Sequence, residues 1–205
     1  MLELHGVECV RGGRVLFSGL SAALPGGHLL RVQGANGAGK TSLLRMICGL
    51  LAPARGELLW NGQPLGKLRE EFGRQLTYVG HAAALKDDLS ARENLLAASA
   101  LAGDAPGAGE AGAALAAAGL AGRADVPARL LSQGQRRRVA LARLALASPA
   151  SLWVLDEPFN ALDSAATQWL LGLVGTQLAS GGSVVLTSHQ NVPLDPAWPL
   201  VELAL

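Results

Sequence analysis

Residues 34–41 read Gly-Ala-Asn-Gly-Ala-Gly-Lys-Thr, and this stretch decides the fold of the 205-residue chain. It matches the phosphate-binding pattern GxxxxGK followed by Ser or Thr, whose glycines let backbone N–H groups turn inward around phosphate oxygens. The apolar segment His28–Gln33 before it is typical of a strand, and Thr41–Leu50 after it has a helical pattern. A helix that starts here directs its positive end at a bound anion. The stretch therefore predicts a strand, a phosphate-binding loop and a helix.

Individual residues of this loop can be given roles. Lys40 is expected to reach the β- and γ-phosphates of a nucleotide, and the Thr41 hydroxyl to bind Mg²⁺. The residues expected to surround the phosphates are Gly34, Ala35, Asn36, Gly37, Ala38, Gly39, Lys40, Thr41 and Ser42.

A second element of a phosphate site follows the apolar run Leu152–Leu155, which ends in Asp156 and Glu157. A buried strand that ends in acids places carboxylates at the edge of a parallel sheet where ligands gather. Asp156 is expected to hold Mg²⁺, directly or through water, and Glu157 to act as the general base on the attacking water. Alone, such a run is more often a strand end with a solvated turn, but the phosphate-binding loop upstream favours the functional interpretation.

The remaining pattern indicates an α/β fold with a parallel sheet. Together with the phosphate-binding loop, it resembles a P-loop NTPase core of the RecA-like kind. Ser183–Thr187 is a further buried strand, and the looser alternation in Leu2–Glu8 and Val15–Leu24 predicts an antiparallel edge near the N-terminus. The Ala-rich stretch Ser90–Leu131 has no strand pattern and predicts an inserted helical subdomain. We expect one domain, with a catalytic core of residues 1–80 and 149–205 and a helical subdomain of residues 81–148.

Composition excludes several classes of protein. Half of the residues are hydrophobic and the net charge is +1, which excludes a disordered chain and argues against a dedicated nucleic-acid binder. The weakly polar run Ala111–Gly122 is shorter than the roughly 20 residues that a membrane-spanning helix needs. The first residues lack the pattern of a signal peptide. Cys9 and Cys48 are too few for a disulfide framework or a zinc site, and we interpret them as small buried hydrophobes. We therefore expect a globular cytoplasmic chain.

Leu131–Gln135 reads Leu-Ser-Gln-Gly-Gln and is followed by Arg136–Leu144, a basic and then apolar helical stretch. Here the sequence resembles the nucleotide-binding subunits of ABC transporters, whose signature is commonly LSGGQ. The resemblance implies ATP and Mg²⁺ as cofactors. It also implies a head-to-tail homodimer, in which Ser132, Gly134 and Gln135 face the γ-phosphate of the ATP that the other copy holds. A capped amphipathic helix explains Ser132 as well, but not the neighbouring motifs. We interpret Arg136–Arg138 as a solvated basic face rather than as phosphate ligands.

Further family elements follow in order, with two departures. Asn160–Asp163 resembles the loop that couples the two ATP sites through Asp163, and His189 resembles the switch histidine that contacts the γ-phosphate and aligns the water with Glu157. His81 stands where the family usually has a glutamine that senses Mg²⁺ and contacts the membrane partner. We hypothesise that His81 keeps this role, as a metal or water ligand. Arg11 stands where an aromatic residue usually stacks on adenine, and a guanidinium can also stack on a base.

Softer features narrow the resemblance to the ATP-binding subunits of the bacterial cytochrome c maturation system, over residues 2–190. These features are the segments Leu16–Ser21, Gly34–Lys40, Tyr78–His81 and Thr187–Gln190. The resemblance implies a peripheral ATPase on the cytoplasmic face of the bacterial inner membrane, which works with integral-membrane haem-handling subunits. ATP hydrolysis is then coupled to haem export or to release of a haem-loaded periplasmic chaperone. The chain has no Cys-x-x-Cys-His motif, so no direct haem site is predicted.

Three alternatives stay open at this point. One is the ATP-binding subunit of another exporter, for a lipid, a drug or a metal. Another is a DNA-repair or chromosome-organising ABC ATPase, although the heptads or Cys pairs that such insertions need are missing between the phosphate loop and the signature. The last is a non-hydrolysing interaction subunit, which Glu157 and His189 argue against.

Overall fold

The computed structural model describes residues 1–146, 151–189 and 192–205. The chain forms two compact units. The core unit comprises Met1–Tyr78, Ala150–Asp156 and Gln177–Leu205, and the helical unit comprises Val79–Pro149 and Glu157–Thr176. Gln190, the last residue of the segment that resembles the switch region, lies outside the described residues.

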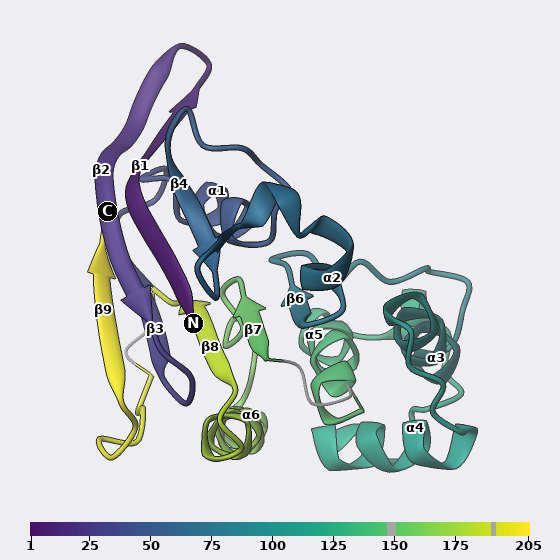
Figure 1. The fold of residues 1–205 in the computed structure, drawn as a ribbon. Helices are drawn as coiled ribbons and strands as arrows, with labels where there is room; N and C mark the ends of the chain where they lie inside the picture. The colour runs from purple at the N-terminus through teal and green to yellow at the C-terminus, as the bar shows by residue number, and fades with distance from the viewer. Residues whose placement is uncertain (147–150, 190–191) are drawn as a thin grey trace. The chain divides into compact units, whose positions relative to one another are not determined.

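An antiparallel sheet forms the N-terminal part of the core unit (Figure 1). Its strands lie in the order β2-β1-β4-β5, and their bounds are β1 Leu2–Arg11, β2 Arg14–Leu24, β4 Arg55–Trp60 and β5 Gln63–Pro64. Gly12 and Gly13 both have positive φ angles, and such a two-residue turn matches the twist of a hairpin. The expected antiparallel edge is confirmed, and β4 adds a strand that the sequence did not predict.

The second sheet has five strands, and the phosphate-binding loop follows its strand β3. The strands lie in the order β6-β7-β8-β3-β9, and their bounds are β3 Leu29–Gln33, β6 Leu76–Val79, β7 Leu152–Leu155, β8 Ser183–Thr187 and β9 Leu200–Ala204. The pairs β7–β8, β8–β3 and β3–β9 are parallel. Every residue of β7 and β8 is buried, which explains why both read as continuous apolar runs.

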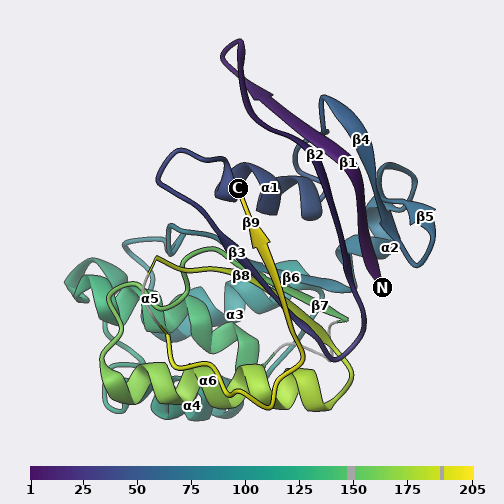
Figure 2. The same cartoon turned by 90° about the vertical axis from the view of Figure 1, so that its left-hand side faces the viewer.

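Strand β9 is the edge strand of this sheet next to β3, and its end lies beside the phosphate-binding loop. Figure 2 shows β9 next to β3, with the C-terminus at its end. The backbone N–H of Leu205 donates to the carbonyl of Gln33 at 3.0 Å, and a Cβ on Gly34 would lie 3.1 Å from the carbonyl oxygen of Leu205. The C-terminal strand therefore packs closely against the first glycine of the loop.

One hydrophobic core joins both sheets and helix α1, which spans Lys40–Ile47. Leu4 of β1, Leu30 of β3 and Leu44 of α1 are all buried in it. Trp60 at the end of β4 packs edge-on against Phe72 of α2 (Arg69–Gly73), with ring centroids 5.2 Å apart. Burial of such apolar surface at about 25 cal/mol per Å² is the main stabilising contribution to this unit.

The helical unit has its own apolar core. Its helices are α3 Ala91–Ala102, α4 Ala108–Leu115 with a π-turn through Leu120, α5 Gln133–Ala142, and the larger part of α6 Ser164–Ala179. Ser90 and Glu93 form a reciprocal capping box at the start of α3, and Gly103 ends that helix with a φ of 91°. Small residues such as Ala111 and Ala114 pack against Leu95 and Leu115. Among the described residues, the structure contains no helix with the length and apolar character needed to cross a membrane.

Candidate functional site

The loop between β3 and α1 is folded around the ammonium group of Lys40. The Nζ atom donates to the carbonyl oxygens of Gly34 at 2.8 Å and Ala35 at 3.0 Å, and only 7% of the residue is exposed. Gly37 and Gly39 have φ angles of 83° and 107°, which glycine adopts without strain. An ammonium held by backbone carbonyls can exchange them for phosphate oxygens, so the cradle is already formed.

Neighbouring residues explain the rest of the loop sequence. A Cβ on Gly39 would lie 2.9 Å from Cε1 of Phe17, so β2 leaves no room for a side chain there. Gly39 is also the N-cap of α1 and contributes no side-chain hydrogen bond, so the first N–H groups of α1 are not capped by it. Ala35, Asn36 and Gly37 form the exposed tip, while Ala38 closes a turn onto the Ala35 carbonyl.

Two hydroxyl groups hold the carboxylate of Asp156 at the end of β7. Thr41 Oγ1 donates to Oδ2 at 2.9 Å, and Thr187 Oγ1 donates to Oδ1 at 2.9 Å. Asp156 is 1% exposed, and Thr187 is fully buried at the end of β8. The structure thus brings together Thr41 and Asp156, the two residues expected to bind Mg²⁺, and adds Thr187, which the sequence analysis did not identify. The signal in the sequence was the position of Thr187, which ends a buried apolar run two residues before His189.

The donor set at Asp156 fits a hard divalent cation. A threonine hydroxyl and a carboxylate 2.9 Å apart are the oxygen ligands that Mg²⁺ prefers. Within the parts of the chain that the structure describes, no group of three or more His, Cys, Asp or Glu side chains could hold a metal ion. At a nucleotide, Mg²⁺ usually binds one or two protein oxygens, and substrate phosphates contribute to the rest of its coordination shell.

Burial dominates the titration of two groups near Asp156. It raises the pKa of the Cys48 thiol to about 12, and the negative charge of Asp156 adds to the shift. Burial also raises the pKa of Tyr78, again with a contribution from Asp156. Both cysteines are free thiols; Cys9 is buried as expected, whereas Cys48 is only partly buried by exposed area. The thiol of Cys48 therefore stays protonated at neutral pH and is a poor nucleophile.

The raised pKa of Cys48 predicts a loss of stability in alkaline solution. A raised pKa in the folded state contributes stability that is fully present below the unfolded value of 9.0 and is lost as the pH rises towards 12. By linkage, the free energy of unfolding should fall by about 2 kcal/mol between pH 8 and 10.5 from this group. Urea unfolding at these two pH values measures the change in the free energy of unfolding. The Cys48→Ala variant should show a shallower pH dependence, and an identical slope would contradict the prediction.

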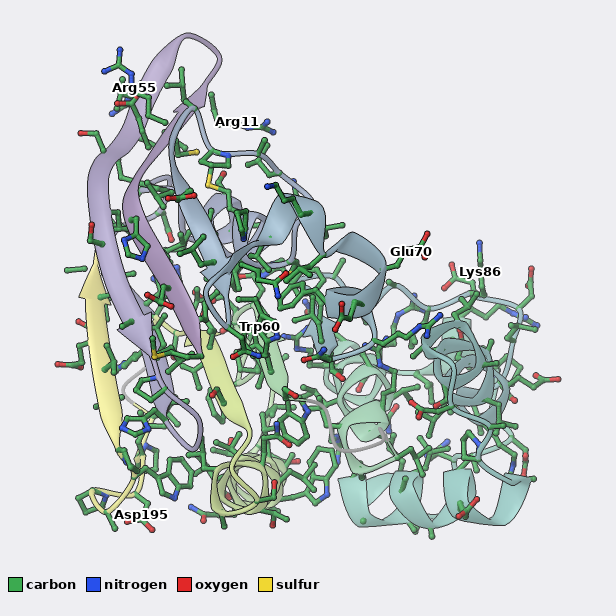
Figure 3. The ribbon with its side chains drawn as sticks, viewed as in Figure 1. Arg11, Arg55, Trp60, Glu70, Lys86 and Asp195 are labelled. Atoms are coloured by element: carbon green, nitrogen blue, oxygen red, sulfur yellow. The ribbon has the colours of Figure 1, made fainter. Side chains whose placement is uncertain are left out.

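Two other predicted residues of the core unit lie on its surface. Arg11 is exposed at the end of β1, opposite Arg14 across the hairpin, at the same end of the sheet as Arg55 (Figure 3). His189 is exposed just beyond β8, two residues after the Thr187 that binds Asp156. The backbone position of His189 is therefore set by β8, whose last residue is hydrogen-bonded to the carboxylate of Asp156.

In the helical unit, the signature segment begins α5. Ser132 is the N-cap: its Oγ accepts from the N–H of Gln135 at 3.2 Å, and Gln135 Oε1 accepts from the N–H of Ser132 at 2.9 Å. A Cβ on Gly134 would lie 2.6 Å from the carbonyl oxygen of Ala161. Glycine is therefore required at position 134 because the segment after Glu157 lies against the first turn of this helix.

The interpretation of Arg136–Arg138 as a solvated face is wrong for Arg137. Arg136 lies at the surface, with Nη1 2.6 Å from Asp87, but Arg137 is only 5% exposed. Its Nη1 donates to the carbonyl of Gly80 at 2.6 Å and its Nη2 to that of Glu157 at 3.0 Å. Position 137 follows Gly134 by one helical turn, so both face the segment after β7. That spacing was the signal in the sequence.

The other predicted residues of this unit lie in loops and at a helix start. Glu157 is 6% exposed and has a φ of 50°, which is unusual for a residue with a side chain. His81 is exposed in the loop after β6. Asp163 Oδ1 accepts from the N–H of Ala166 at 2.8 Å and so caps the start of α6.

Comparisons with known proteins agree with this geometry. Residues 17–160 match the ABC transporter family. The chain is 51% identical over 205 residues to the cytochrome c biogenesis ATP-binding export protein CcmA of Dechloromonas aromatica (strain RCB), with all of both chains covered. It is 52% identical over 193 residues to the protein of the same name from Aromatoleum aromaticum, covering 94% of this chain and 90% of that one.

Solved structures show the same fold. A putative ABC transporter ATP-binding protein from Pyrococcus furiosus superimposes with a TM-score of 0.83 at 25% identity, covering 100% of this chain and 96% of the other. A dimeric ATP-binding cassette in a post-hydrolysis state, bound to ADP and Pi, gives a TM-score of 0.79 at 25% identity over 99% and 94% of the two chains.

Proposed function

This chain belongs to the ABC transporter family, and within it to the cytochrome c biogenesis ATP-binding export proteins, and we propose that it is the ATP-hydrolysing subunit of a membrane complex for cytochrome c maturation. It is an ABC-type ATPase. Identity of about 50% along the whole chain to relatives of that name is the observation that carries the proposal. It favours this complex over an exporter of a lipid, drug or metal, and over a non-transport ABC ATPase.

ATP is proposed to bind in the cradle around Lys40. The ammonium group would leave the carbonyls of Gly34 and Ala35 for the β- and γ-phosphates, while the N–H groups of the loop and of the first turn of α1 donate to phosphate oxygens. Thr41 and Asp156 would hold Mg²⁺, which neutralises charge on the phosphates when bound. Arg11 is proposed to stack on the adenine from the end of β1.

Glu157 and His189 are proposed to prepare the attacking water. Glu157 would accept a proton from the water as it attacks in line with the leaving phosphate, and His189 would contact the γ-phosphate and keep the water aligned. His81 is proposed to sense Mg²⁺. A buried carboxylate adjacent in sequence to the proposed Mg²⁺ ligand supports this assignment.

Two copies are proposed to close head to tail on two ATP molecules. The Ser132 oxygen accepts a hydrogen bond from the N–H of Gln135, so the hydroxyl proton is left to donate to a γ-phosphate oxygen of ATP in the partner copy. Gly134 and Gln135 lie in the same first helical turn. The dimeric, ADP-bound state of a structural neighbour supports dimerisation. Asp163 is proposed to couple the two sites.

The complex is proposed to lie at the cytoplasmic face of the bacterial inner membrane, with this chain as its peripheral ATPase. Integral-membrane subunits would handle haem, because nothing in this sequence provides a c-type haem attachment motif. ATP hydrolysis would drive haem export or release of a haem-loaded periplasmic chaperone. The loop that carries His81 and the helical unit would transmit the motion to these partners.

Affinity capture from detergent-solubilised membranes tests this function. The full chain, tagged and expressed in its own cells, should retain integral-membrane proteins that carry haem, detected by the haem absorbance band and by mass spectrometry. Capture of permease subunits without haem would instead support another exporter. A Lys40→Ala bait, which should assemble but bind ATP poorly, shows whether nucleotide controls the association.

The hydrogen bond from Thr187 to Asp156 predicts a specific effect on Mg²⁺ dependence. The Thr187→Val variant keeps the shape of the side chain but removes one donor to the carboxylate. Loss of a group that orients a metal ligand typically costs about 10- to 100-fold in metal affinity or activity. The Mg²⁺ concentration for half-maximal ATPase activity should rise by about tenfold, and Thr187→Ser should restore it. Equal Mg²⁺ dependence in the Val and Ser variants would contradict the prediction.

A further inference from the structure

Arg137 connects two loops of the helical unit that lie far apart in the sequence. Its Nη1 donates to the carbonyl of Gly80 at 2.6 Å and to that of His81 at 3.3 Å. On the other side, Nη2 donates to the carbonyl of Glu157 at 3.0 Å. A guanidinium presents its donors in a rigid planar fork, so one side chain can hold two chain segments at once. Burying such a charge is costly, which argues that this position serves a purpose.

Both ends of the His81 loop are anchored within the helical unit. Arg137 holds its beginning, at Gly80 and His81. Asn94 of α3, which is 5% exposed, holds its far end: Oδ1 accepts from the N–H of Lys86 at 2.7 Å, and Nδ2 donates to the carbonyl of Lys86 at 3.0 Å. The exposed His81 is therefore carried on a loop with a defined backbone position.

The backbone of Glu157 needs support. A φ of 50° is unfavourable for a residue with a Cβ, and Ala161 in the same segment has a φ of 61°. The Glu157 carbonyl accepts from Arg137 at 3.0 Å and from the N–H of Asn160 at 3.2 Å. These bonds stabilise a turn that the chain does not prefer, and the turn sets where the Glu157 side chain leaves the backbone.

We propose that Arg137 is a positioning residue for ATP hydrolysis, which ties the backbone of His81 to that of Glu157 so that the proposed Mg²⁺ sensor and the proposed general base move together. The proposal rests on the roles assigned above to His81 and Glu157. Arg137 would act through the backbone carbonyls of these residues, to which its guanidinium donates.

Hydrogen exchange of the full-length chain tests the tie without relying on activity. In Arg137→Lys and Arg137→Met, amides of residues 79–86 and 157–163 should exchange at least several-fold faster, while those of α3 keep their protection. A single ammonium cannot span both loops, so lysine should fail to restore the tie. Arg123→Met, at an exposed arginine of the same unit, should leave both segments unchanged. Unchanged exchange in the Arg137 variants would overturn the proposal.

A double-mutant cycle with His81→Ala tests the catalytic consequence. Arg137→Lys should lower kcat about tenfold or more with little change in KM, because misplacement of reacting groups mainly affects the transition state. Once the tie is lost, adding His81→Ala should have less than about twofold further effect, whereas independent roles would multiply the losses. Multiplying losses would overturn the proposal, as would failure of both Arg137 variants to fold.

The hydrogen-exchange measurement and the double-mutant cycle distinguish a failure of this proposal from a failure of the proposed role of His81. If His81→Ala alone left ATP hydrolysis and its Mg²⁺ dependence unchanged, the role of His81 would be wrong. The exchange comparison would then still decide whether Arg137 holds both loops.

Discussion

Replacing Glu157 by glutamine should abolish ATP turnover while ATP binding is retained. The amide has nearly the shape of the carboxylate, so it can occupy the same buried position, which is 6% exposed. It cannot accept a proton from water, and loss of a general base costs about 10²- to 10⁴-fold in rate. Steady-state phosphate release measures turnover, and equilibrium binding of a fluorescent ATP analogue measures affinity.

The control for Glu157→Gln is the same change at Glu70, an exposed residue of α2. Glu70→Gln should hydrolyse ATP as the unaltered chain does. Rapid steady-state hydrolysis by Glu157→Gln would show that another group activates the water. Weak ATP binding by this variant would instead indicate that the turn at Glu157 had been disturbed.

Replacing Lys40 by alanine should weaken ATP binding and hydrolysis together. The ammonium group makes two hydrogen bonds inside the loop, and charge-assisted bonds are worth about 1.5–3 kcal/mol each. Because 1.4 kcal/mol corresponds to a factor of ten, loss of the equivalent bonds to phosphates should lower ATP affinity by about 10²- to 10⁴-fold. Turnover should fall by a further factor of about 10²–10³, since the charge also stabilises the transition state.

Lys67 provides the matched control, because it is an exposed lysine of the same unit. Titration calorimetry with ATP on Lys40→Ala and Lys67→Ala, together with phosphate release, compares the two positions. An ATP affinity within about threefold of the unaltered chain in Lys40→Ala would place the phosphates elsewhere. Thermal unfolding of Lys67→Ala should be nearly unchanged, because substitutions of exposed residues seldom change stability by more than about 0.5 kcal/mol.

The secondary structure around the nucleotide cradle could be predicted because its determinants are local. Leu152–Leu155 and Ser183–Thr187 are continuous apolar runs, and the structure shows them as fully buried strands. Strand β4 was missed because only Leu58 and Trp60 in it are buried. Its extended form depends on pairing with β1, where Leu4 opposes Leu58 across the sheet. The residues of β4 alone do not indicate that this segment pairs with β1.

Side chains that bridge distant segments escaped prediction for the same reason. Thr187 meets Asp156 across 31 residues of sequence, and Arg137 meets Gly80 across 57. Arginine is rarely buried, so a run of three arginines on a helix indicates a solvated face unless the contacts of that helix are known. Only the packing of α5 against the segment after Glu157 distinguishes Arg137 from its neighbours.

Sequence by itself was enough to identify the chemistry of this protein. A glycine loop with its lysine, acids at the end of an apolar strand and the LSQGQ segment each act through residues adjacent in the chain, so their order alone specifies an ABC ATPase. The tertiary structure was needed to show how these groups are held. Carboxylate orientation by Thr187 and the tie formed by Arg137 arise from hydrogen bonds between strands, loops and helices that meet only when the chain is folded.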